Sequence, residues 1–201
     1  MSSELYIGFV AAATALVAMP GPNVALIVAN AMKHGPRAGL TTVAGTATAI
    51  AIQLALTVLG ASAILALMAD WFSILRWIGV AYLVWLGLRA WNAPVEDLGA
   101  SGAVPRDFYM RGLLVSISNP KTLLFFGAFL PQFVTPGPDE TGQLALLAVT
   151  FFVLSSFGDS LWALFAGRLA RFLKIDGRIR NRATGGLLIG AGLGLALARR
   201  P

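Results

Sequence analysis

The chain has 201 residues, of which 57% are hydrophobic and only 12% are charged, and its mean hydropathy is +0.77. Soluble domains carry about 25% charged residues because their surfaces face water, so this composition excludes a water-exposed globular fold and indicates a membrane protein. The net charge of +6 is then explained by basic cytoplasmic loops rather than by a nucleic-acid partner. Because the chain has no cysteine and only one histidine, it offers no thiolate or His-rich metal site.

Six apolar segments follow one another along the chain. They cover residues 5–32, 39–69, 71–91, 109–134, 143–167 and 183–198. A helix that crosses the membrane needs about 20 residues, and only the last segment, which is short and rich in glycine, falls below that length. The sequence therefore predicts an all-α polytopic membrane protein, in which residues 1–201 form a single transporter-like domain of six transmembrane helices.

The basic residues lie mostly on one side of these predicted helices. The connections after the first, third and fifth segments carry eleven Lys and Arg residues, against three on the opposite side. Cytoplasmic loops are enriched in Lys and Arg, so both termini are expected outside.

The helix count also suggests an internal symmetry. Residues 1–91 and 109–201 would each hold three helices, with a linker over residues 92–108. Two related halves with an odd number of helices must insert with opposite orientation, which is the inverted-repeat plan of many secondary transporters.

Two prolines interrupt the first apolar segment. Pro20, Gly21, Pro22 and Asn23 follow one another late in it. Proline lacks a backbone donor and clashes with the preceding turn, so a continuous helix cannot pass through this sequence. In lipid the freed carbonyl groups need partners, which restricts the interruption to the protein interior or a wet cavity.

The fourth segment is interrupted in a comparable way. Ser118 is followed by Asn119, Pro120, Lys121 and Thr122. Asn before Pro is a helix-start pattern, because Asn caps the first turn and Pro occupies the first helical position, where no donor is needed. Each interruption is predicted to begin a half-helix with unpaired amides at the positive end of its dipole.

The two interruptions are expected at similar depth in the membrane. About 10 residues, or ~15 Å, separate each from the cytoplasmic end of its segment. Two positive helix ends in one layer form a site for a carboxylate. The alternative is that the prolines only kink their helices, as prolines in membrane helices often do.

These two motifs resemble the signature of the LysE/RhtB family of amino-acid exporters. The resemblance rests on Pro20–Asn23, on the run from Gly112-Leu113-Leu114 through Asn119–Thr122, and on its continuation to Phe129–Phe133. It implies a carrier of the bacterial inner membrane that exports an amino acid or related small metabolite, driven by protons or the membrane potential. The residues of the two interruptions, Pro20–Asn23 and Asn119–Thr122, would bind the substrate during alternating access.

Two ionisable residues stand out at membrane depth, where such groups are functional candidates by default. Lys121 lies just inside the second half-helix, and Asp159 lies within the fifth segment. Lys121 is expected to attract the substrate carboxylate, and Asp159 to bind its amino group or the coupled proton. The alternative is a permanent ion pair between them that only joins two helices.

Further polar and small residues allow two interpretations each. Gln53 and Ser118 would add polar lining to the site, but Gln53 is as well explained as a tie between helices. The small-residue rows Gly45-x-x-x-Ala49 and Gly186-x-x-x-Gly190 permit close helix contact, either within one chain or across a homodimer.

Rival functions find less support in the sequence. An intramembrane enzyme would have to use a Ser–Lys dyad of Lys121 with Ser116 or Ser118. A cation channel or metal transporter would need several acidic residues inside the membrane, where only Asp159 is present. No enzyme activity and no cofactor are expected. Surrounding lipid and a small-molecule substrate are the expected partners.

Overall fold

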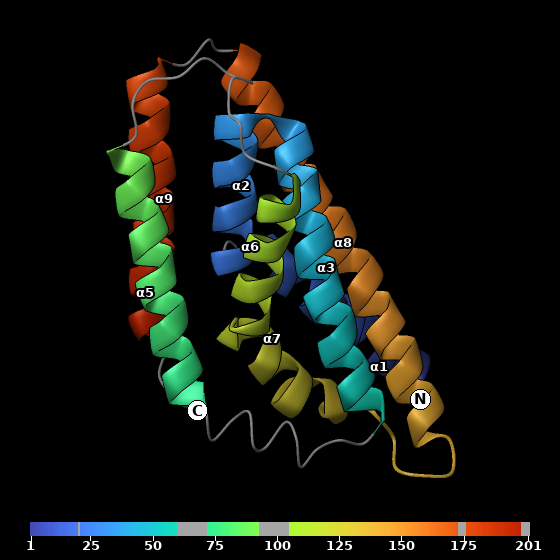
Figure 1. The fold of residues 1–201 in the computed structure, drawn as a ribbon. Coiled ribbons are helices and arrows are strands. Elements are labelled where there is room, and N and C mark those ends of the chain that lie inside the picture. Colours follow the sequence, from blue (N-terminus) through green and yellow to red (C-terminus); the bar gives the residue numbers. More distant parts are fainter. Residues whose placement is uncertain (20, 60–71, 93–104, 173–175, 198–201) are drawn as a thin grey trace.

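The computed structural model describes residues 1–19, 21–59, 72–92, 105–172 and 176–197, and every regular element in these ranges is helical (Figure 1). The all-α prediction is confirmed for this part of the chain. In chain order the elements are α1 (Ser3–Ala18), α2 (Pro22–His34), α3 (Pro36–Val58), α5 (Phe72–Trp91), α6 (Pro105–Ile117), α7 (Pro120–Leu124), the π-helical turn η1 (Phe125–Phe129), the 3-10 turn η2 (Leu130–Phe133), α8 (Glu140–Phe172) and α9 (Gly177–Leu197).

Two of the described helices are long and apolar enough to cross a membrane by themselves. They are α3 and α8, and α1 and α2 together pass the same test as a pair bent by 48°. Part of the predicted second segment, 60–69, and most of the predicted linker, 93–104, lie outside the described residues.

The long helix α3 contacts three other α-helices of the bundle. It packs against α6, α8 and α2, while α9 packs against α5 and α2, so α5 and α9 stand together on one side (Figure 1). Phe9, Phe126 and Phe151 are fully buried and join α1, η1 and α8 into an aromatic core. This core fixes the chain that follows the second interruption.

Glycines let α3 and α6 approach to backbone contact. A Cβ atom on Gly45 would overlap the carbonyl oxygen of Tyr109, and one on Gly112 would overlap the carbonyl oxygen of Thr42. The small-residue row of α3 therefore serves packing within the chain. On α9, in contrast, Gly190 is exposed with open space beside it.

Replacing Gly112 with alanine is expected to destabilise the bundle. The added methyl group would meet backbone, which cannot rotate away as a side chain can, so we expect a loss of about 3 kcal/mol and a melting temperature about 6–12 °C lower. Gly190→Ala is the matched control, because its methyl group enters open space and alanine favours helix. Thermal denaturation in detergent measures both, and equal melting temperatures would contradict the contact.

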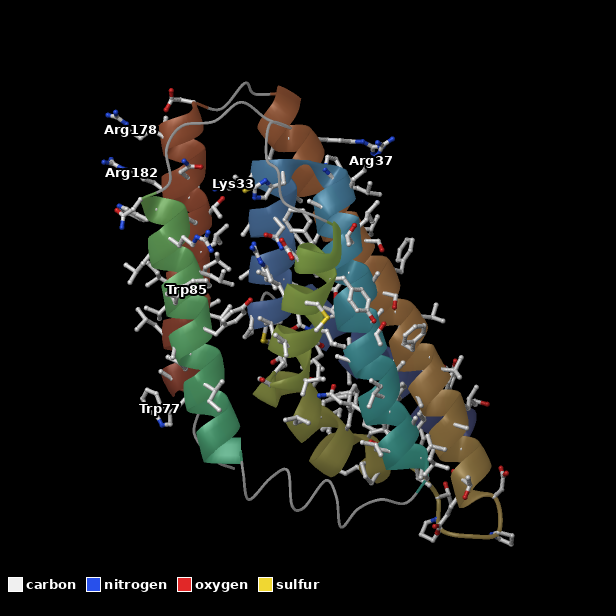
Figure 2. All side chains as sticks on the ribbon, in the orientation of Figure 1. Lys33, Arg37, Trp77, Trp85, Arg178 and Arg182 are labelled. Atoms are coloured by element: carbon white, nitrogen blue, oxygen red, sulfur yellow. The ribbon has the colours of Figure 1, made fainter. Side chains whose placement is uncertain are left out.

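Basic side chains gather at one end of the bundle. Lys33, Arg37, Arg178 and Arg182 lie at the end where α2 finishes and α9 begins (Figure 2). The start of α1 and the end of α9 lie at the opposite end (Figure 1). These basic side chains are thus concentrated at the end of the bundle opposite the start of α1.

Candidate functional site

The two predicted interruptions meet in the middle of the bundle. α1 ends at Ala18 and α2 begins at Pro22, while α6 ends at Ile117 and α7 begins at Pro120. The side chain of Asn119 donates from Nδ2 to Oδ1 of Asn23 over 2.9 Å, and both residues are buried. Residues 96 apart in sequence are therefore joined directly. Pro20 lies outside the described residues.

Asn23 also connects the first interruption to two further helices. Its Nδ2 donates to Oγ of Ser116 over 3.1 Å, and that hydroxyl donates to the carbonyl of Thr46 on α3 over 3.4 Å. The start of α2, the end of α6 and the middle of α3 are thus held by one chain of buried hydrogen bonds.

Asn119 caps the short helix that follows it. Its Oδ1 accepts from the backbone N–H of Lys121 over 3.0 Å, and Thr122 donates from Oγ1 to its carbonyl over 3.0 Å. Pro120 occupies the first helical position, where no donor is needed. One side chain therefore both begins α7 and reaches across to α2.

The bond between Asn23 and Asn119 can be measured by a double-mutant cycle. Asn23→Ala and Asn119→Ala each lose other bonds as well, but the cycle isolates the shared one, for which we expect about 0.6–2 kcal/mol of coupling. Unfolding in mixed micelles gives the four free energies. Asn23→Ala combined with Gln143→Ala, which removes bonds to Thr135 in a loop, is the control and should be additive. Additivity of the Asn23 and Asn119 substitutions would contradict the bond.

Gln53 is a tie between α3 and the end of α6. Its Nε2 donates to the carbonyls of Ser116 and Ile117, each over 3.3 Å. Pro120 cannot supply the helical N–H that would reach Ser116, and the carbonyl of Ser116 instead accepts from the N–H of Asn119 over 3.1 Å and from the amide of Gln53. Gln53 does not line the cleft described below. The structure thus places it as a tie, one of the two interpretations of the sequence.

Lys121 reaches across the first interruption. Its Nζ donates to the carbonyl of Met19 over 2.6 Å, and its aliphatic part passes Gly21, where a Cβ atom would lie 3.5 Å from Cδ. Met19 is the C-cap of α1, whose end carries unpaired carbonyl groups and the negative pole of the helix dipole. A backbone carbonyl therefore holds the ammonium group.

Asp159 faces the same space from α8. It is 6% exposed, and it interacts with the charge of Lys121. Both charged residues lie in the described part of the chain, and no direct ion pair joins them. In the described structure the ammonium of Lys121 is bonded to the carbonyl of Met19.

These residues line one narrow cleft, which has a cavity volume of about 30 Å³. Its polar wall consists of Gly21, Asn23, Asn119, Lys121, Thr122, Ser155 and Asp159. Its apolar wall consists of Leu16, Val17, Val24, Ile50 and Phe151. The cleft thus combines one cation, one anion, neutral hydrogen-bonding groups and an aliphatic and aromatic surface.

Two of the residues predicted for the site face elsewhere. Pro22 and Ser118 line a different, mainly apolar cavity next to α5. The side chain of Pro120 is not among those described. Ser155, which the sequence analysis missed, lies one turn before Asp159 on α8 and so on the same face, a spacing that would have found it.

A helical bundle with a charged cleft at its centre fits a membrane transporter, and the comparisons agree. The chain matches the family model described as LysE type translocator over residues 14–199, and it belongs to that family of membrane transporters. The family resemblance drawn from the two motifs is thereby confirmed. No solved structure matches the chain.

Its curated relatives include proteins named for efflux. A homoserine/homoserine lactone efflux protein of Salmonella typhi is 29% identical over 99% of both chains. A leucine efflux protein of an Enterobacter strain is 30% identical over 88% of this chain and 86% of its own. An uncharacterized membrane protein of Vibrio cholerae is 29% identical over 99% of this chain and 100% of its own.

Proposed function

We propose that the protein exports an uncharged amino acid or a closely related metabolite from the bacterial cytoplasm. The observation that carries the proposal is the shared cleft of Lys121 and Asp159, two opposite charges at the meeting point of the interruptions with no direct bond between them. Efflux relatives named for homoserine and leucine support the same class of substrate.

The substrate is a zwitterion that inserts between the two charges. Its carboxylate binds the ammonium of Lys121 beside the start of α2, whose first turn has no side-chain cap and whose dipole is positive there. Its amino group binds the carboxylate of Asp159. Asn119 and Thr122 complete the polar contacts from the lining of the cleft.

The apolar wall selects the substrate side chain. Val17, Ile50 and Phe151 offer no partner for a second charge, and burying an unpaired charge against them would cost several kcal/mol. Short aliphatic or hydroxylated side chains are therefore the expected substrates, and lysine or glutamate is not.

Transport proceeds by alternating access of two halves. Residues 1–91 and 109–201 form inverted three-helix units joined by a linker over 92–108, with α1–α2 and α6–α7 as the two interrupted spans among six. The carboxylate competes with the Met19 carbonyl for Lys121, which links substrate occupancy to the position of α1. The basic end faces the cytoplasm of the inner membrane, both termini lie outside, and protons or the membrane potential drive efflux.

The rival functions are less well supported by the contacts. In the described part of the chain, the hydroxyl of Ser116 is bonded to Asn23 and the Thr46 carbonyl, and Ser118 lines the separate apolar cavity. Lys121 bonds Met19, so these contacts do not favour a Ser–Lys dyad. The described residues also contain no group of three or more His, Cys, Asp or Glu side chains placed to hold a metal ion.

Efflux from living cells tests the proposal. Bacteria that express the protein are fed dipeptides, and every amino acid in the medium is compared with that from empty-vector cells. We expect one or a few uncharged amino acids to rise at least severalfold. No increase for any amino acid, at membrane levels verified by blot, would overturn the proposed substrate class.

A further inference from the structure

A second cavity lies at the basic end of the bundle, separate from the cleft. It has a cavity volume of about 640 Å³, it is lined by α2, α5, α6 and α9, and it shares no lining residue with the cleft of Lys121 and Asp159. Figure 2 shows the labelled Lys33 and Trp85, which both line it, on α2 and α5 on either side of this space.

The charged groups of this cavity are all basic. Arg89 of α5 and Arg111 of α6 line it together with Lys33 and His34 of α2, and its described lining includes no acidic residue. Aromatic rings support the two guanidinium groups, since Arg89 lies 5.4 Å from the ring centre of Trp85 and Arg111 5.8 Å from that of Phe108. The cavity is therefore built for an anion.

A buried hydroxyl group adds a polar contact to the same space. Thr184 of α9 lines the cavity, is 3% exposed, and its Oγ1 has no hydrogen-bond partner within the described structure. A buried hydroxyl without a partner costs free energy.

A separate, mainly apolar cavity lies on the same helices. It has a volume of about 150 Å³ and is lined by Ile78, Tyr82, Leu114 and Pro22 among others. Helices α2, α5 and α6 line both cavities. On each helix a residue of one cavity lies about one turn from a residue of the other: Pro22 and Leu26 on α2, Tyr82 and Trp85 on α5, and Leu114 and Arg111 on α6. The rings of Tyr82 and Trp85 also stack, with their centres 6.0 Å apart. These two neighbouring cavities, one basic and one apolar, are together called the groove.

The groove opens outward between α5 and α6. Ile78 and Leu114 line its apolar part and are 57% and 50% exposed. Along α5 the distance from Arg89 to Ile78 is eleven residues, or about 16 Å, which is the length of a large part of an acyl chain. An amphipathic ligand can therefore enter from the side.

We propose that this groove binds an anionic phospholipid. Its phosphate lies between Arg89 and Arg111, because guanidinium groups bind phosphate oxygens through paired hydrogen bonds and basic pockets between membrane helices bind lipid headgroups. One acyl chain follows Tyr82 and Leu114 into the apolar part. A zwitterionic amino acid would lack an acidic partner for its amino group there, which separates this groove from the transport cleft.

Native mass spectrometry of the purified protein tests the proposal. The protein is mixed with phosphatidylglycerol and phosphatidylcholine of identical acyl chains, and the ratio of the two bound lipids is measured. We expect wild type to prefer phosphatidylglycerol and the variant Arg89→Gln/Arg111→Gln to lower that ratio at least tenfold. Arg37→Gln/Arg178→Gln removes two exposed basic charges and is the matched control, which should keep the wild-type ratio.

Two further arms separate the possible ligands. Leu114→Trp fills the apolar part and should reduce bound phosphatidylglycerol without any change of charge, which keeps the test valid if the arginine variant does not fold. Millimolar glycerol phosphate, the headgroup without chains, should not displace the lipid. An unchanged lipid ratio in the arginine variant, displacement by glycerol phosphate, or a groove closed by a second copy of the chain would overturn the proposal.

Discussion

Lys121→Met is expected to lower the apparent affinity for the exported amino acid about 10- to 100-fold. Methionine keeps the length of the side chain and removes its charge, so the substrate carboxylate loses a charge-assisted bond of about 1.5–3 kcal/mol. The fold should persist, because Met19 is 59% exposed and water can take the place of the lost ammonium at its carbonyl. Concentration-dependent efflux from cells or proteoliposomes measures the change.

The control for this substitution is Arg37→Gln. It also removes one positive charge, but Arg37 is exposed at the basic end of α3, away from the cleft (Figure 2). Its affinity and rate should match wild type. Wild-type affinity in Lys121→Met, with equal amounts of protein in the membrane, would remove Lys121 from the substrate site and leave it a structural link between α1 and α7.

Asp159→Asn should abolish net export while the protein stays folded. The amide keeps the shape of the side chain, but it holds neither a proton nor the charge that an amino group needs. Burying a carboxylate is costly unless it is paired, and no ion pair is formed here, so the unfolding free energy should be unchanged or higher.

Counterflow in proteoliposomes separates the two roles of Asp159. In counterflow the carrier exchanges labelled for unlabelled substrate and needs no net proton movement. If Asp159 binds the amino group, Asp159→Asn loses counterflow together with net export. If it carries only the proton, counterflow persists at the wild-type rate. Net export that survives the substitution would remove both roles.

The two interruptions were predictable because they are local. Proline lacks a donor wherever it occurs, and Asn119 caps α7 through an oxygen that accepts from the N–H of Lys121, only two residues away. The same holds for the all-α class, which follows from the length and apolarity of the segments. No tertiary contact is needed for either inference.

The partner of Lys121 was not predictable in this way. Opposite charge alone would pair Lys121 with Asp159. In the structure, however, the ammonium of Lys121 donates a hydrogen bond to the carbonyl of Met19, 102 residues away. A backbone carbonyl at a helix end has no side chain of its own to mark it in the sequence. Only the tertiary arrangement, in which α1 packs against α8 and η2, brings the two together.

The sequence by itself determined the membrane class, the positions of both interruptions and the two charged candidates, since hydrophobicity, proline geometry and ionisable groups act residue by residue. Only the tertiary structure decided which neighbours face the cleft. Adjacent residues on a helix point about 100° apart, so Asn23 enters the cleft while Pro22 faces the apolar cavity beside α5. That rotation of α2 is fixed by the buried bonds of Asn23 with Ser116 and Asn119, which join distant parts of the chain.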